Sequence, residues 1–411
     1  LGGVLGAALD ANLRGRLRHF ITAPDSPAIA LFSPEHRAHN TEGDWYGEHA
    51  GKWLSAAARA FVRSGDAVLG DNLRRVADYL LSVQEADGYL GTYAEERRFT
   101  HPQPPKPPSW DGAPALRTWD IWVHAYLILG LVETARAVQD VRYTRAAGRI
   151  ADLCAQALAS GIDITTLGNH HGMSATVLMD AALELHEETG EPRFLALAQR
   201  VLEQANAHPA LRLLPALEAG ADASEIATGK AYQLLWNLVA LVKLCRVTGD
   251  AGLRDTLERI WQNIRDHHLT LGGGPWGGVA HRSREVFNAR GSFSPNAYVE
   301  TCSLLSWIQF NRELLRLTGE ACFAEEIERT AYNDLLGAQA PDGEDWCYYS
   351  FPNGRRVHTT YWRCCKSSGA MALEELPALA YAVEGEAVRV QLYGPGEARL
   401  AHPRAGMVSL R

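Results

Sequence analysis

The sequence predicts an all-α protein whose helices form an (α/α)6 barrel, a toroid with an inner and an outer ring of helices. Three observations support this fold class. Apolar residues recur at three- and four-residue spacing from about residue 45 to 382, the spacing that places them on one face of a helix. A short junction motif recurs between successive helical segments. β-branched runs and Asn-Gly hairpin signals are nearly absent over the same span.

Many segments carry the amphipathic pattern and are therefore predicted as helices. Examples are Trp53–Val62, Val76–Val83, Trp122–Val138, Ala175–Leu185, Leu234–Val247 and Tyr298–Leu317. Cys154 and Cys245 also lie within helical patterns. We interpret both as buried packing residues, because a free cysteine behaves as a small hydrophobe.

The junctions between helices repeat a polar residue, a glycine and an acidic residue. They are Ser64-Gly65-Asp66, Thr189-Gly190-Glu191, Thr248-Gly249-Asp250 and Thr318-Gly319-Glu320. Glycine accepts the left-handed conformation that ends a helix, and an acidic residue suits the start of the next one. The unit is thus a helical hairpin repeated about six times. This number favours a closed (α/α)6 barrel, and an open solenoid is the alternative.

Four irregular inserts interrupt the helical pattern, and loops on a rigid scaffold often carry functional sites. They are His101–Trp110, Gly161–His171, Leu271–Asn296 and Ala340–Arg363. The first is rich in proline and is therefore expected to be stiff and non-helical. Inserts of this kind favour the closed barrel, because they resemble loops around one mouth of a toroid.

The domain boundaries follow from where the helical pattern begins and ends. Residues 1–44 are predicted as an N-terminal extension, 45–383 as the barrel, and 384–411 as the start of a β-domain or a β-tail. In this last segment, residues 388–392 alternate apolar and polar side chains, and Tyr393-Gly-Pro-Gly follows. A strand and a turn are therefore expected.

Composition narrows the class of protein without naming a substrate. The 411 residues are 46% hydrophobic and 21% charged, as in a soluble globular protein. A net charge of −8 argues against a nucleic-acid partner, which usually meets a basic face. No apolar run approaches the roughly 18 residues that span a bilayer, so no membrane partner is expected. Residues 1–9 make a poor secretory signal, which favours a cytoplasmic location.

Five of the seven cysteines lie in the last third of the chain, and three of them suggest a metal site. Cys364 and Cys365 are adjacent and precede a helical pattern, where a helix N-terminus favours thiolates. Cys302 lies two residues after Glu300, at the start of another predicted helix. Three thiolates and one carboxylate supply the four ligands of a tetrahedral Zn²⁺ site. Buried cysteines with no common role are the alternative.

The pattern Glu300-x-Cys302 followed by Cys364-Cys365 resembles the zinc site of family 127 glycoside hydrolases, the β-L-arabinofuranosidase family and its relatives. Further stretches agree: Trp45–Leu54, Tyr89–Tyr93, Trp119–His124 and Gly229–Tyr232. The resemblance covers about residues 40 to 385. It implies an (α/α)6 barrel followed by β-sandwich domains, of which the C-terminal β segment would be a remnant. It also implies hydrolysis of a glycosidic bond with retention of anomeric configuration.

The same resemblance implies roles for individual residues. Cys364 matches the nucleophile, and Glu300, Cys302 and Cys365 match its zinc co-ligands. Glu285, fifteen residues before Glu300, matches the general acid/base. The chemistry is coherent, because a coordinated thiol is deprotonated and a glutamate can protonate the leaving oxygen and then activate water.

A further set of residues is expected to contact the sugar. They are Glu48, His49, His124, His171, Trp276 and Tyr349. Tyr349 matches a tyrosine near the nucleophile, although the stretch from it to Cys364 is short. For His124, a histidine of the packed core is the alternative. Lys230 stands where the arabinofuranosidases have a histidine, and this departure leaves the identity of the sugar open.

Two other functional classes remain as alternatives. A sugar epimerase or a polysaccharide lyase on the same toroid would use His or Tyr pairs and would leave the cysteines without a role. A non-catalytic carbohydrate-binding or scaffold protein would use zinc only to tie Glu300 to the Cys364 segment, and a site closed by four ligands is typical of structural zinc. A barrel surface left without β-domains could also bind a second copy as a homodimer.

Overall fold

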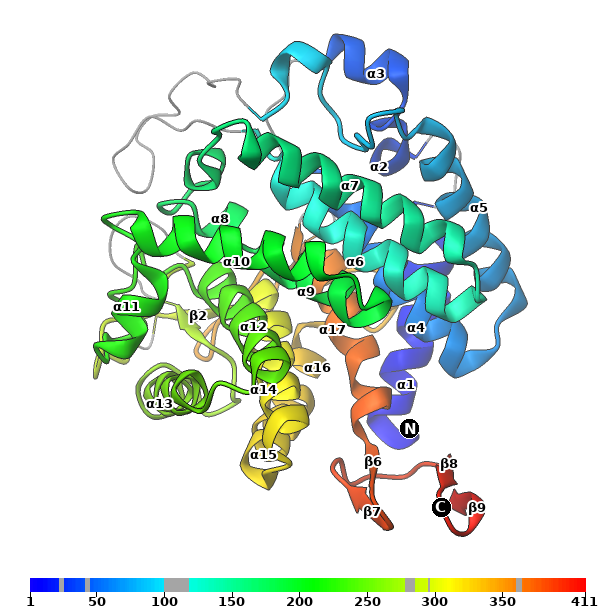
Figure 1. The fold of residues 1–411 in the computed structure, drawn as a ribbon. Helices are drawn as coiled ribbons and strands as arrows, with labels where there is room; N and C mark the ends of the chain where they lie inside the picture. The colour runs from blue at the N-terminus through cyan, green and yellow to red at the C-terminus, as the bar shows by residue number, and fades with distance from the viewer. Residues whose placement is uncertain (22–25, 41–44, 100–117, 278–284, 295, 360–363) are drawn as a thin grey trace.

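A computed structural model of the chain describes residues 1–411 except 22–25, 41–44, 100–117, 278–284, 295 and 360–363. The described chain is mostly helical, which confirms the predicted fold class (Figure 1). The predicted insert His101–Trp110 lies outside the described residues.

Within the described residues, six helices form a closed inner ring in which each packs against the next. They are α4 (Glu48–Ser64), α6 (Asp120–Val138), α9 (Leu178–Thr189), α12 (Ala231–Thr248), α14 (Thr301–Thr318) and α17 (Cys364–Leu379). The last helix, α17, packs against both α14 and α4, so the ring closes on itself. An open solenoid would keep α4 and α17 apart, and the predicted closed barrel is therefore confirmed.

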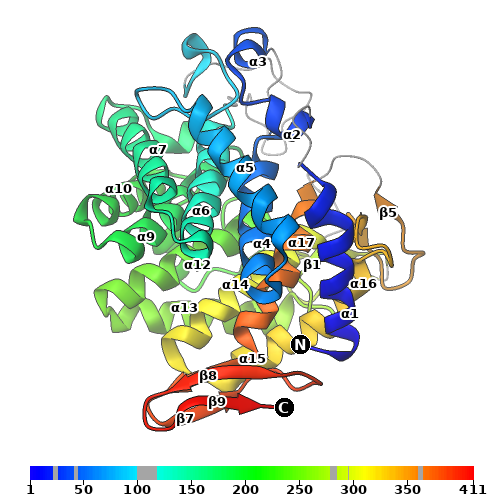
Figure 2. The same cartoon turned by 90° about the vertical axis from the view of Figure 1, so that its right-hand side faces the viewer.

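Outer helices pack against the inner ones. They are α5 (Ala67–Val83), α7 (Val141–Ala159), α10 (Pro192–Ala207), α13 (Ala251–His267), α15 (Ala321–Thr330) and α1 (Gly3–Asn12). Helix α1 lies along α17, so this outer helix comes from the segment predicted as an N-terminal extension (Figure 2). The shorter helices are α2 (Pro27–Ala30), α3 (Pro34–His39), α8 (Met173–Thr176), α11 (Leu213–Glu218) and α16 (Leu336–Ala338). Short 3-10 and π turns cover 13–17, 95–97, 164–167 and 331–335.

Burial separates the two rings. Every residue of α6 from Asp120 to Val132 is buried, because an inner helix has neighbours on all sides. The outer helix α5 buries only one stripe, from Leu69 through Leu73 and Val76 to Leu80. Helix α6 is also long and apolar enough to cross a membrane by length and composition, but 78% of its apolar window is buried inside the barrel. Its hydrophobicity is that of a core helix.

The predicted junctions form as expected. Gly65, Gly190, Gly249 and Gly319 each end a helix in the left-handed conformation, with φ between 64° and 73°. The following Asp66 and Asp250 cap the next helices by accepting hydrogen bonds from the backbone N–H of Leu69 and Leu253, at 2.8 and 3.0 Å. One further junction between helices was not predicted, because Gln139 rather than a glycine adopts the left-handed conformation there.

Helices α4 and α6 approach so closely that glycine is required where their backbones meet. A Cβ atom on Gly51 would lie 2.3 Å from the carbonyl oxygen of Tyr126, and one on Gly130 would lie 2.5 Å from the carbonyl oxygen of Gly51. Real Cβ atoms do not approach backbone this closely, so a side chain at either position would push the two helices apart.

Gly51→Ala is therefore expected to lower the free energy of unfolding by about 1–3 kcal/mol, the usual cost of overpacking. Alanine alone would favour the helix by roughly 0.5–1 kcal/mol, so the sign of the change tests the contact. Gly148→Ala in α7 is the matched control, because its Cβ would meet no atom closer than 3.4 Å. Urea unfolding measures both, and equal stabilities of the two variants would contradict the expected clash.

Two of the predicted inserts carry short strands. Strands β1 (Trp276–Gly277), β2 (Tyr298–Glu300) and β4 (Tyr349–Ser350) form an antiparallel sheet in the order β1-β2-β4. Strands β3 (Trp346–Cys347) and β5 (His358–Thr359) form a second pair. The helix predicted over Tyr298–Leu317 therefore begins at Thr301, because residues 298–300 pair with neighbouring strands instead.

The C-terminal segment forms two hairpins beyond the end of α17 (Figure 1). Strand β6 (Tyr381–Glu384) pairs with β7 (Ala387–Val390), and β8 (Ala398–His402) pairs with β9 (Gly406–Leu410). The strand expected at 388–392 is confirmed with its bounds moved to 387–390. The helical pattern expected up to residue 382 stops at Leu379, because the next residues pair with β7.

Candidate metal centre and active site

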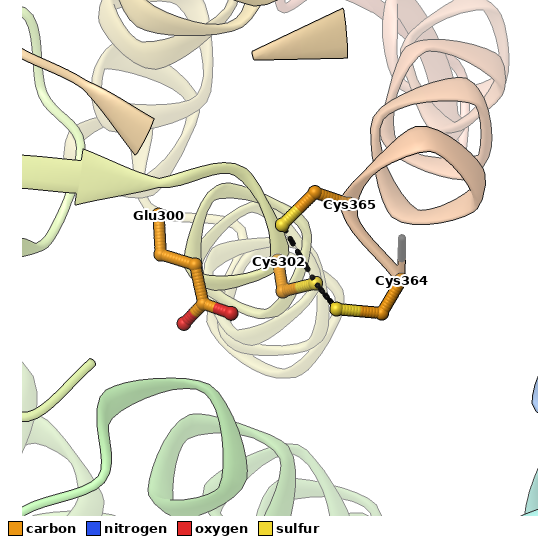
Figure 3. A group of neighbouring side chains, drawn as sticks. All are labelled: Glu300, Cys302, Cys364 and Cys365. Atoms are coloured by element: carbon orange, nitrogen blue, oxygen red, sulfur yellow. Dashed lines mark hydrogen bonds between the residues drawn. The ribbon is translucent and has the colours of Figure 1, made fainter. Parts of the chain in front are cut away.

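The four predicted ligands meet at one end of the inner ring (Figure 3). Glu300 is the last residue of β2, and Cys302 lies in the first turn of α14. Cys364 and Cys365 begin α17, the neighbour of α14 in the ring. Their ligand atoms all lie within 4.8 Å of one another. The Sγ atom of Cys302 lies 3.4 Å from that of Cys364 and 3.3 Å from that of Cys365.

This donor set fits a metal ion such as zinc. Two sulfurs bound to one zinc at about 2.3 Å lie roughly 3.8 Å apart in a tetrahedron, so the observed spacing needs only a small expansion. Thiolates are soft ligands and select zinc over hard cations such as magnesium or calcium. Glu300 is 3% exposed, while Cys302 and Cys365 are fully buried. The ligands therefore form a group largely shielded from solvent.

The thiols differ in their tendency to ionise. Hydrogen bonds from Cys302, which has the larger effect, and from Cys365 hold the pKa of Cys364 well below the usual value for a thiol. Burial raises the pKa of both Cys302 and Cys365 well above that value. Cys364 is also the most accessible of the three, at 9% exposed. The surroundings therefore favour ionisation of Cys364 over that of the other two thiols.

Glu285 reaches the same site from the segment before β2. Its Oε1 accepts hydrogen bonds from the hydroxyl groups of Tyr348, at 2.7 Å, and Tyr349, at 2.9 Å. The Tyr348 hydroxyl is also 3.5 Å from the Sγ of Cys364. Tyr349 was expected near the predicted nucleophile, and the contact that the structure gives its hydroxyl is with the predicted acid/base, Glu285. Tyr348 was not predicted, and the adjacent Tyr-Tyr pair is the signal that could have indicated it.

Lys230 joins the predicted acid/base to the metal ligands. Its Nζ forms an ion pair with Glu285 and lies 3.2 Å from Oε2 of Glu300. The backbone fixes this arrangement, because Lys230 and Val286 are bridge partners and the N–H of Ala231 donates to the carbonyl oxygen of Glu285. The sequence marked Lys230 only as a departure from the family pattern. Its contacts make it a member of the site.

Glu48 and His49 form part of the wall beneath the cysteines. Both are fully buried, so neither presents an open face to a sugar in this structure. Glu48 is 2.8 Å from the Nζ of Lys52 and also accepts a hydrogen bond from Trp122. Burial raises the pKa of Glu48 to about 7, although Lys52 opposes the shift. The Nδ1 of His49 is 2.7 Å from the Oγ of Ser367 on α17.

His124 does not join the cluster. It is fully buried, and its Nδ1 lies 3.5 Å from the Sγ of Cys154 on the outer helix α7. Its ring packs against Tyr89 and Phe99, and burial lowers its pKa to about 3. These contacts are those of a core histidine between the two rings, the alternative considered for it.

His171 and Trp276, two of the predicted sugar contacts, each pack against another aromatic ring. The ring of His171 packs beside His208 at the end of α10. Its neighbour His170 is buried and lies 2.6 Å from Thr228, two residues before Lys230. Trp276 belongs to β1, is 9% exposed and packs against Phe293. Little of the Trp276 indole is therefore open for stacking on a sugar.

Comparison with known proteins identifies the family of the chain. Residues 9–378 match the family described as "Beta-L-arabinofuranosidase, GH127 catalytic domain". A non-reducing end β-L-arabinofuranosidase of Bifidobacterium longum subsp. longum is 24% identical over 320 residues, covering 72% of this chain and 47% of the relative. The chain thus spans about half the length of that relative.

Solved structures with a similar fold include two GH127 proteins. A GH127 β-arabinofuranosidase superposes with a TM-score of 0.77 at 22% identity, covering 97% of this chain and 63% of the other. A GH127 β-L-arabinofuranosidase from Geobacillus stearothermophilus T6 gives 0.74 at 20% identity, covering 98% and 68%. With the family match spanning most of the sequence, the chain belongs to the family of GH127 catalytic domains of the β-L-arabinofuranosidase type.

Proposed function

We propose that this chain is a glycosidase that hydrolyses a β-L-arabinofuranoside or a related sugar with retention of anomeric configuration. The observation that carries the proposal is that one tyrosine, Tyr348, contacts both Glu285 and Cys364. The Tyr348 hydroxyl lies 2.7 Å from the Glu285 carboxylate and 3.5 Å from the Cys364 sulfur. This shared contact supports the assignment of Glu285 as acid/base and Cys364 as nucleophile for one glycosidic bond.

In the first step, the Cys364 thiolate attacks the anomeric carbon and forms a C–S bond while the bond to the leaving oxygen breaks. Glu285 gives its proton to that oxygen, and the alcohol leaves. In the second step, Glu285 removes a proton from water, which attacks the same carbon and releases Cys364 as a thiolate. Two inversions at one carbon give net retention.

Zinc held by Glu300, Cys302, Cys364 and Cys365 would supply one chemical property, thiols kept deprotonated at neutral pH. The protein's own residues do the rest. Tyr348, Tyr349 and Lys230 together fix both oxygens of the Glu285 carboxylate. Two of these donors are adjacent residues at β4 and the third precedes α12, so the carboxylate keeps one orientation, which favours proton transfer along one direction.

The scaffold alternative keeps one specific observation in its favour. Four protein ligands close a tetrahedral zinc site, which is typical of structural zinc. Under that alternative, Glu285 would have no chemical task. The contacts of Glu285 with two tyrosines and a lysine beside the cysteines favour the catalytic function, because a purely structural ion does not require them.

A panel of p-nitrophenyl furanosides and pyranosides tests the proposal. We expect release of p-nitrophenol from at least one furanoside, with the β-anomer as the first product when the reaction is followed by proton NMR. The same panel also identifies the preferred sugar. That question is open because Lys230 stands beside Glu285 at a position where the family has a histidine. Zinc-loaded, folded protein that is inert on every sugar would support the scaffold alternative, and a product of inverted configuration would contradict the proposed mechanism.

A further inference from the structure

Lys52 is a fully buried lysine next to the metal ligands, and the proposed reaction assigns it no task. It lies on α4, and its Nζ donates to Oε1 of Glu48 at 2.8 Å and to Oγ of Ser368 at 2.9 Å. The rings of Tyr126 and Tyr232 face the same nitrogen, with centroids 4.7 and 5.5 Å away. A buried ammonium is costly unless each of its protons has a partner, so these contacts fix the position of Nζ.

Ser368 connects this lysine to a metal ligand. Its Oγ lies 3.2 Å from the Sγ of Cys302. A thiolate has no proton to give, so with Cys302 ionised the Ser368 hydroxyl is the donor. Its oxygen is then free to accept from Lys52. The result is a polarised chain from Lys52 through Ser368 to Cys302, in which the positive charge strengthens the hydrogen bond to sulfur.

The negative charge of the four ligands explains how the hydrogen bonds from Lys52 through Ser368 to Cys302 would stabilise the metal centre. Three thiolates and one carboxylate carry four negative charges, and a divalent ion offsets two of them. The remainder is buried, where uncompensated charge is expensive. Lys230 stands beside Glu300, but it also contacts Glu285. Lys52 instead acts on the cysteine side of the centre through Ser368.

We propose that Lys52 is a positioning residue of the metal centre, which orients the Ser368 hydroxyl toward Cys302 and offsets the charge of the thiolates, and thereby strengthens zinc binding. The inference rests on the proposed metal centre. It concerns the affinity for zinc, and it does not depend on which sugar is cleaved.

Two variants test the hydrogen bonds that run from Lys52 through Ser368 to Cys302. Ser368→Ala removes the hydrogen bond to Cys302 and leaves the ion pair of Lys52 with Glu48 in place. Lys52→Met combined with Glu48→Gln removes the ammonium without leaving a buried carboxylate unpaired, which avoids the main cost of breaking a buried ion pair. In both we expect zinc to bind about 10- to 100-fold more weakly, the usual cost of losing an outer-sphere partner. Competition with a chromophoric chelator measures the affinity.

Cobalt substitution supplies a readout that a purely structural role would leave unchanged. The thiolate-to-cobalt charge-transfer absorption of the Co²⁺-loaded protein should shift in both variants, because a hydrogen bond lowers the energy of the sulfur lone pair. Lys243→Met is the matched control. Lys243 is an equally buried lysine on α12, paired with Asp180 at 2.7 Å and with Glu184. Its loss should lower the thermal midpoint without changing zinc affinity or the cobalt spectrum.

The outcomes separate the two proposals. Weaker zinc binding together with a shifted cobalt spectrum in both variants, and neither change in Lys243→Met, would support the role of Lys52. Zinc-loaded wild type with unchanged affinity in both variants would overturn the role of Lys52 alone. Wild-type protein that binds no zinc would overturn the metal centre, and this inference with it.

Discussion

Cys364→Ala is expected to abolish turnover of a p-nitrophenyl glycoside, and Glu285→Gln is expected to slow it by about 10²–10⁴-fold. The two losses have different causes. Without the thiolate no C–S bond can form. With glutamine in place of Glu285 the first step still proceeds, because p-nitrophenolate leaves without help from an acid. The second step then stalls, since glutamine cannot take a proton from water.

Glu285→Gln should therefore accumulate a glycosyl group on Cys364. Mass spectrometry of the acid-quenched protein should show one added glycosyl mass on the peptide that contains Cys364, together with a burst of p-nitrophenol. Cys245→Ala is the control, because Cys245 lies on α12 and contacts the carbonyl oxygen of Asp250 instead of the cluster. It should keep full turnover. An adduct on any other residue, or normal turnover by Cys364→Ala, would rule out Cys364 as the nucleophile.

The second large effect concerns the metal. Wild-type protein is expected to hold one zinc per chain, and Cys302→Ala is expected to hold none, since a buried ligand is lost from a set of four. Ligand binding stabilises a fold by about 4 kcal/mol when the free ligand exceeds its Kd by roughly 1,000-fold. The loss of zinc should therefore lower the thermal midpoint by several degrees. Metal analysis and calorimetry measure the two effects.

Cys245→Ala again serves as the control, with zinc content unchanged and only a small loss of packing. Chelation of the wild type should reproduce the lowered midpoint of Cys302→Ala, and zinc should restore it. A chelated wild type that unfolds at its original temperature would show that the four residues do not hold a stabilising ion.

The barrel could be predicted because its signals are local. The glycine junctions and the three- and four-residue spacing each act within one helix or one turn, and the structure reproduces them. The junction at Gln139 was missed because a non-glycine residue takes the left-handed conformation there. The strand at 298–300 was missed because its partners, β1 and β4, lie in segments that carry no strand pattern of their own.

The clustering of Glu300 with Cys302, Cys364 and Cys365 could be predicted because two short motifs lie at helix starts, and neighbouring helices of a ring place their starts together. The residues that contact these four side chains could not be predicted. Lys230 meets Glu285 and Glu300 across 55 and 70 residues, and only the closed ring sets the direction of its long side chain. His124 shows a different limit of prediction from sequence, because it was predicted to line the site and does not. It lies on an inner helix buried on all sides, where periodicity cannot distinguish the pocket from the space between the rings.

The packing of α17 on α4 also dictates when the site can form. Lys52 and Ser368 are separated by 316 residues, and Arg16 and Ser367 by 351, so the contacts under the cysteines join the two ends of the chain. Loops of this length close slowly, because their entropy is lost before the contacts compensate. A nascent chain that has emerged as far as Cys302 still lacks Cys364 and Cys365. Under the proposed metal centre, the complete set of four ligands would therefore exist only once α17 has packed into the ring, and a bound ion would report that the ring has closed.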